Sequence, residues 1–168
     1  PTLLAEPGEP LAEAVWAQLA AAVEGAAERD GFVVVSGSMP PRTRPEHVEG
    51  LIDAARRAGA SVVVDTSGPA LLAAARAGAH YVTPNETEVI EASGAATLED
   101  GMTALLRSGA GTVVVSRGAS GFQGVTTGRP AVRHRAVPGV SGNPTGAGDA
   151  ATAGLVAALA DGAPLEAA

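Results

Sequence analysis

The chain contains no cysteine and no lysine, and aromatic residues make up only 2% of its 168 residues. The absence of cysteine excludes disulfide bridges and thiolate metal sites. With so few aromatic rings, the core has to be built from Ala, Val and Leu. The net charge of −7 argues against a nucleic-acid partner, because a nucleic-acid-binding surface needs a basic stripe.

Long apolar segments are also missing. The longest uncharged one, 150–160, is too short to cross a bilayer, and the first residues do not have the pattern of a signal peptide. We therefore predict a cytoplasmic protein with no membrane partner. The length fits one domain or a large part of one. Because the sequence starts at Pro1 and stops at Ala168 where a helical pattern begins, we expect both ends to continue in the natural protein.

Short apolar segments alternate with segments of helical periodicity. The predicted strands are 32–35, 61–65, 80–83 and 112–116, followed by a hairpin of 121–127 and 131–137. The predicted helices are 11–29, 45–58, 70–77, a short one from 84, 98–107 and 150–160. Trp16, in the first of these helices, is predicted to pack in the core. The alternation predicts an α/β fold with a parallel sheet that helices cover on both faces.

Polar segments follow four of the predicted strands, at the point where each strand ends. These segments are 36–40, 65–67, 84–88 and 116–121. In parallel sheets, ligands bind beyond the carboxyl ends of the strands. The four segments are therefore candidates for a common site.

The most informative segment, Asn143-Pro-Thr-Gly-Ala-Gly-Asp149, lies just before the last predicted helix. Its glycines allow backbone N–H groups to point out of a helix N-terminus, which attracts anions. A carboxylate beside a bound phosphate and a hydroxyl can accept a proton, as phosphoryl transfer to an alcohol requires. Taken alone, such a segment is more often just a tight turn with Asp149 in the first helical turn.

Five segments together resemble the ribokinase-like, or pfkB-type, carbohydrate kinases, and most of all the branch of 1-phosphofructokinase and tagatose-6-phosphate kinase. The matching segments are 33–41, 64–68, 83–88, 113–121 and 143–149. They occur in the order of the family, and the last is its C-terminal signature. The resemblance implies a Rossmann-like parallel sheet with helices on both faces. Residues 1–168 would be its C-terminal core, without the N-terminal half, the lid or a second domain.

The same resemblance implies ATP-dependent phosphoryl transfer, with Mg²⁺, to a hydroxyl of a sugar phosphate. Asp149 would be the base that accepts the proton of that hydroxyl. The amides of Gly146, Ala147 and Gly148 would form the anion hole for the transferring phosphoryl group. Gly148 would also contact the nucleotide.

Two further segments match the family's ligand contacts. Asn85 and Glu88 match its Asn-x-x-Glu, which implies that Asn85 helps to hold the phosphates and that Glu88 holds Mg²⁺ through water. Alone, this pair is typical of a helix capping box. The loop along the nucleotide would consist of Ser116, Arg117, Gly118, Ala119, Ser120 and Gly121, although a plain β-turn has the same composition.

Gly37, Ser38 and Asp65 also lie at or just after the ends of predicted strands. Gly37 and Ser38 match a strand-end segment near the phosphates, whereas Asp65 is predicted to brace the loop that follows its strand. The sequence departs from the family at Thr83, where lysine is common, and at Arg42 and Arg117. These departures affect nucleotide contacts and leave the predicted fold unchanged.

Two alternatives to a sugar-phosphate kinase stay open at this stage. One is a family member that phosphorylates ribose, a nucleoside or a vitamin alcohol. The other is a binding module that holds a nucleotide or phosphate without turnover. Since the sugar-gripping half is missing from 1–168, we expect this segment by itself to be inactive and prone to associate. The full-length protein is compatible with a homodimer.

Overall fold

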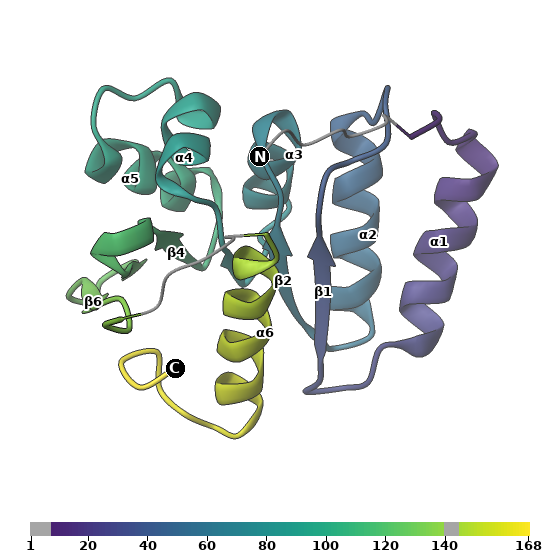
Figure 1. Cartoon of the computed structure of the whole chain (residues 1–168). Coiled ribbons are helices and arrows are strands. Elements are labelled where there is room, and N and C mark those ends of the chain that lie inside the picture. Colours follow the sequence, from purple (N-terminus) through teal and green to yellow (C-terminus); the bar gives the residue numbers. More distant parts are fainter. Residues whose placement is uncertain (1–7, 140–144) are drawn as a thin grey trace.

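The computed structural model describes residues 8–139 and 145–168. A six-stranded sheet in the order β1-β2-β3-β4-β5-β6 lies at its centre (Figure 1). The strands are β1 (Phe32–Ser36), β2 (Ser61–Asp65), β3 (Tyr81–Val82), β4 (Thr112–Ser116), β5 (Phe122–Thr126) and β6 (Val132–His134). Strands β1 to β4 are parallel, while β5 and β6 continue the sheet as an antiparallel hairpin. Both features confirm the sequence prediction.

Helices cover the two faces of the sheet very unequally. The helices are α1 (Glu13–Ala26), α2 (Pro45–Arg57), α3 (Gly68–Arg76), α4 (Glu86–Ser93), α5 (Leu98–Ser108) and α6 (Ala147–Ala160). Helices α1 to α5 lie on one face, and α6 lies on the other (Figure 1). The order of the sheet explains this arrangement, because crossovers of one hand between successive parallel neighbours place every connecting helix on the same side. Helices therefore lie on both faces, as predicted, but the second face has only α6 over it among the described helices.

The core is aliphatic, as the composition predicted. On β2 and β4, alternate valines pack against the helices on the five-helix face, where Ile52 and Leu71 are fully buried. Period-2 alternation sends the intervening residues of these strands to the α6 face. At the edge of the sheet, Val34 of β1 stays 44% exposed on that second face. The α6 face is thus the open side of the molecule.

Helix α1 is the outermost helix and packs against α2. Trp16 is buried, as predicted, and its ring stacks on His47 with a centroid distance of 4.6 Å. The apolar residues Leu11, Val15 and Leu19 remain about 40% exposed. Their helical spacing correctly indicated a helix, but the structure places no sheet or helix over them within its described part.

Helix α6 begins earlier than the sequence analysis predicted. It starts at Ala147 and not at 150, so that Ala147, Gly148 and Asp149 form its first turn behind the N-cap Gly146. Asn143, the first residue of the signature segment, lies outside the described residues. In the part of the chain that the structure describes, every helix is too short or too polar to span a membrane.

Candidate active site

A polar cleft of about 250 Å³ opens where β1 and β2 end and α6 begins. Its walls come from the segments 36–38 and 65–67, from Glu88 on α4, and from Gly146, Gly148 and Asp149. Three of the four polar segments predicted to share a site therefore meet here. They meet because parallel strands deliver their carboxyl ends to the same edge of the sheet.

The first turn of α6 presents backbone N–H groups to this cleft. Gly146 has a left-handed backbone with φ 80° and, as a glycine, it provides no side-chain cap. The first hydrogen bond of the helix runs from the Ala150 N–H to the Gly146 carbonyl at 2.9 Å. The N–H groups before Ala150 have no acceptor inside the helix, because the first four amides of any α-helix lack one. The geometry therefore suits the binding of an anion.

The glycines at 146 and 148 differ in backbone conformation. Gly146 needs its positive φ, whereas Gly148 lies in regular helix. A Cβ at Gly148 would meet no heavy atom within 4 Å, so packing in this structure does not require glycine there. The space above Gly148 is therefore open to an incoming group.

The Asp149 carboxylate lies at the exposed mouth of the cleft, beside the end of β1. Its Oδ1 is 3.3 Å from the Ser36 hydroxyl, and the same hydroxyl is 3.4 Å from Oδ2 of Asp65. Since a serine hydroxyl carries one proton, Ser36 donates to one carboxylate at a time. Two carboxylates from segments far apart in the sequence thus share a single donor.

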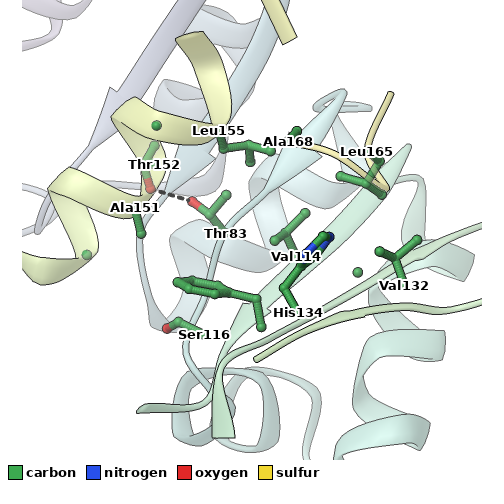
Figure 2. Close-up of a pocket in the computed structure, with 14 residues that line it drawn as sticks. Thr83, Val114, Ser116, Val132, His134, Ala151, Thr152, Leu155, Leu165 and Ala168 are labelled. Atoms are coloured by element: carbon green, nitrogen blue, oxygen red, sulfur yellow. Dashed lines mark hydrogen bonds between the residues drawn. The ribbon is translucent and has the colours of Figure 1, made fainter. Parts of the chain in front are cut away.

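Asp65 has a second donor, which the sequence analysis missed. The hydroxyl of Thr152, one turn after Asp149 on α6, donates to Asp65 Oδ2 at 3.1 Å. The Thr83 hydroxyl lies 3.2 Å from the Thr152 hydroxyl (Figure 2). Asp65 therefore braces β1, β2 and α6 together, a wider role than bracing its own loop. No local pattern in the sequence predicts this contact, because Thr152 is a threonine within an alanine-rich helix.

Asn85 and Glu88 form the capping box that their spacing predicts. The Asn85 Oδ1 accepts from the Glu88 N–H at 2.9 Å, and the Glu88 Oε2 accepts from the Asn85 N–H at 2.8 Å. Glu88 also lines the cleft. The capping function is confirmed, whereas the roles of Asn85 toward phosphate and of Glu88 toward a metal remain predictions.

The predicted nucleotide loop, 116–121, contains a short 3₁₀ turn over Gly118–Ser120. Gly118, Ala119 and Ser120 are exposed on its surface. The Arg117 guanidinium donates to Glu86 at 3.1 Å and to Gln123 at 3.3 Å, so local partners already hold it. Gly121 has a packing reason to be glycine, because a Cβ there would overlap the His134 carbonyl.

A second cavity, also of about 250 Å³, adjoins the cleft at Gly148 (Figure 2). It lies between α6 and the hairpin of β5 and β6, and Ser116 and Thr83 lie on its wall. Its remaining lining is mainly apolar, with Val114, Phe122 and Leu155 among the contributing residues. A polar cleft that leads into an apolar cavity suits a ligand with an anionic end and a flat apolar end.

Comparison with known proteins agrees with this geometry. The family model for pfkB family carbohydrate kinases matches residues 4–168. The chain belongs to this family. The match confirms the resemblance inferred from the five sequence segments.

Individual relatives are phosphofructokinases. The chain is 34% identical to the ATP-dependent 6-phosphofructokinase isozyme 2 of Escherichia coli over 146 residues, which cover 83% of this chain and 47% of that protein. It is 36% identical to the 1-phosphofructokinase of Rhodobacter capsulatus over 141 residues, covering 80% of this chain and 44% of the relative. The chain thus spans about half the length of the curated relatives it matches.

Solved structures confirm the ribokinase-like fold. The phosphofructokinase-2 of Escherichia coli in complex with fructose-6-phosphate superposes with a TM-score of 0.83 at 33% identity, covering 96% of this chain and 54% of that one. The ribokinase of Arabidopsis thaliana, at 18% identity and a TM-score of 0.68, shares the fold.

Proposed function

We propose that the protein transfers a phosphoryl group from ATP to a hydroxyl of a sugar phosphate. The observation that carries this proposal is the pairing of a helix N-terminus whose N-cap is a glycine with the Asp149 carboxylate at one polar cleft. An anion site beside a carboxylate is the equipment that this reaction needs, because positioning and electrostatic stabilisation supply most of its catalysis.

In this proposal the nucleotide extends across the two adjoining cavities. Its phosphates bind at the amides of Gly146, Ala147 and Gly148, where the helix dipole favours negative charge. Its base enters the apolar cavity beyond Gly148, beside Ser116. The rest of the loop, from Arg117 to Gly121, then follows the nucleotide along the end of β4.

The residues around the cleft also fit a Mg²⁺ ion that accompanies ATP. Magnesium prefers oxygen ligands and is commonly held by one or two carboxylates, by water and by the phosphates of the substrate. Glu88 lines the cleft and would hold the ion through water. When bound, Mg²⁺ supplies positive charge that offsets the charge of the phosphates.

Asp149 then acts as the general base. Its carboxylate accepts the proton of the acceptor hydroxyl as the oxygen attacks the terminal phosphorus of ATP. The bond from that phosphorus to the ADP oxygen breaks, and ADP leaves. The amides of the first turn stabilise the negative charge on the transferring group. The Ser36 hydroxyl, which can donate to either Asp149 or Asp65, orients the base before the proton arrives.

The acceptor is proposed from the relatives. Their names specify phosphofructokinases, so fructose 1-phosphate or fructose 6-phosphate is the first choice, and tagatose 6-phosphate is the acceptor implied by the sequence resemblance. We further propose a cytoplasmic protein that forms a homodimer when full length. One Escherichia coli phosphofructokinase-2 structure is described as a tetrameric inhibited form, which supports self-association.

The decisive test of this function is Asp149→Asn in the protein made from its complete coding sequence. Loss of a general base typically costs roughly 10²–10⁴-fold in rate. We therefore expect kcat to fall by roughly that factor, while ATP affinity measured by calorimetry stays near the wild-type value. A variant that keeps more than about a third of wild-type kcat would remove Asp149 from the role of base.

The acceptor class is tested with a panel of alcohols. Fructose 1-phosphate, fructose 6-phosphate, tagatose 6-phosphate, ribose and a nucleoside are each offered with Mg²⁺ and ATP, and ADP release is followed. The proposal expects the highest kcat/KM with a sugar phosphate. Preference for ribose or the nucleoside would favour another kinase of the family, whereas ATP binding without turnover on any acceptor would favour a binding module.

A further inference from the structure

Helix α6 carries the proposed base, yet few of its side chains hold it in place. Of its residues, all of which the structure describes, Thr152 and Leu155 are buried and the others remain at least partly exposed. The side chain of Asp149 and the whole first turn are exposed to solvent. The anchor nearest to Asp149 is therefore Thr152, which is only 5% exposed.

The position of Thr152 links the base to the sheet. Residues three apart in a helix lie on the same face, so the side chains of Asp149 and Thr152 both point toward the ends of the parallel strands. Asp149 reaches the end of β1 through Ser36, and Thr152 reaches the end of β2 through Asp65. A rotation of α6 that moved Thr152 off Asp65 would carry the Asp149 carboxylate with it.

Because each hydroxyl has a single proton, the direction of the hydrogen bonds around Thr152 can be assigned. Each threonine hydroxyl has one proton, and the Asp65 carboxylate only accepts. Because Thr152 gives its proton to Asp65, the hydrogen bond over the 3.2 Å contact is donated by Thr83, whose hydroxyl has the Val64 carbonyl at 3.5 Å as a longer alternative acceptor. The order of donation is thus Thr83 to Thr152 to Asp65. Removing the central hydroxyl breaks both hydrogen bonds and leaves Asp65 with the Ser36 donor alone among its described side-chain partners.

We propose that Thr152 is a positioning residue for Asp149: its buried hydroxyl, held between Asp65 and Thr83, fixes the first turn of α6 over the strand ends. This inference rests on the proposed function of Asp149 as the base. Thr152 touches neither the acceptor nor the phosphates in this proposal, and the part of its side chain that lines the apolar cavity keeps its shape in a valine. It acts through the place it gives to the Asp149 carboxylate.

The central experiment is Thr152→Val, which keeps the shape of the side chain and removes its hydroxyl, in the protein made from its complete coding sequence. Because small misplacements of a reacting group can cost up to roughly 100-fold in rate, we expect kcat to fall roughly 10- to 100-fold. The KM for ATP should stay within about twofold, since the anion site uses backbone amides. Thr152→Ser, which restores the hydroxyl, should recover most of kcat.

A matched control comes from a second threonine pair. Thr112, 6% exposed, lies with its hydroxyl 2.9 Å from that of Thr126 at the far end of β4. Thr112→Val removes an equally buried hydroxyl and should leave kcat unchanged. Thr83→Val removes the donation to Thr152 and the longer contact with the Val64 carbonyl but leaves the bond from Thr152 to Asp65 intact, so it should lower kcat less than Thr152→Val does. It also provides a second variant in case Thr152→Val does not fold.

A double-mutant cycle separates positioning from general damage. In the Asp149→Asn background there is no base left to position, so adding Thr152→Val should lower the residual kcat by less than about twofold. A drop equal to that in the wild-type background would overturn the proposal, as would a Thr152→Ser variant as slow as Thr152→Val. If Asp149→Asn itself keeps its activity, the proposed base is wrong, and this result is distinct from any outcome at Thr152.

Discussion

Helices α4 and α6 both begin at the carboxyl edge of the sheet and border the same cleft, but their N-termini are built in opposite ways. At α4 the side chains of Asn85 and Glu88 satisfy each other's backbone N–H groups. At α6 the N-cap is Gly146, which has no side chain with which to accept a hydrogen bond. One helix satisfies its terminal donors with its own side chains, whereas the N-cap residue of the other offers no side chain to do so.

The difference separates a structural N-terminus from one suited to a ligand. An N-cap side chain stabilises a helix by about 1 kcal/mol relative to alanine but by only a few tenths relative to glycine, so Gly146 leaves the amides of α6 without a side-chain acceptor at little cost. An anion at the same place can supply the missing acceptors when it binds. When no anion is bound, α6 is stabilised by contacts farther along the helix, chiefly those of Thr152 and Leu155. The fold thus keeps amides available at α6 and stabilises the helix elsewhere.

Blocking the open N-terminus should produce the largest change in binding. Gly148→Val adds a side chain over the first-turn amides at a place where no protein atom lies within 4 Å of a Cβ. We expect ATP or inorganic phosphate to bind at least about tenfold more weakly by calorimetry, which corresponds to about 1.4 kcal/mol. The thermal unfolding of the sheet should change far less than the binding.

Gly50→Val is the control for this substitution. Gly50 also lies in a helix, α2, and a Cβ there would likewise meet no atom within 4 Å. Both variants therefore place valine at an unobstructed helical glycine, one in the first turn of α6 and the other in the interior of α2. Equal phosphate affinities for the two folded variants would contradict the assignment of the anion site to α6.

Removing the cap of α4 should have a smaller effect, and mainly on stability. Asn85→Ala leaves the Glu88 N–H without its side-chain acceptor, and we expect a loss of about 1 kcal/mol in the free energy of unfolding measured with urea. Thr97→Ala is the matched variant at α5, where the Thr97 hydroxyl accepts from the Asp100 N–H at 3.2 Å. Its stability loss should be similar, but ATP binding should weaken only for Asn85→Ala, because Asn85 is the residue predicted to help hold the phosphates. Equal ATP affinities in both variants would limit Asn85 to capping.

The smallest change in stability is expected for Asn85→Asp. Aspartate caps helices about as well as asparagine, so the free energy of unfolding should stay within about 0.5 kcal/mol of the wild type. The new negative charge would nevertheless repel nearby phosphates. A few-fold weaker affinity for ATP that recovers with added salt would support a phosphate contact at Asn85, and an unchanged affinity would argue against one.

Local sequence patterns predicted the features that depend on interactions within a single segment of the chain. Apolar runs such as 61–65 and 112–116 gave strands, because side chains buried on both faces of a sheet have to be apolar. The spacing of Asn85 and Glu88 gave the capping box, because both partners lie within one helical turn. The two glycines before Asp149 lie at the start of α6, where the anion site remains a prediction.

Only the tertiary structure decided how these parts meet. It placed α1 to α5 on one face, since the hand of the crossovers and the strand order act together and neither can be read from a single segment. It also gave Thr152 its contacts, because Asp65 and Thr83 lie 87 and 69 residues away in the sequence. A hydroxyl in an alanine-rich helix has no local partner that would reveal its role. The sequence therefore determined the elements and the candidate base, and long-range packing determined what holds that base in place.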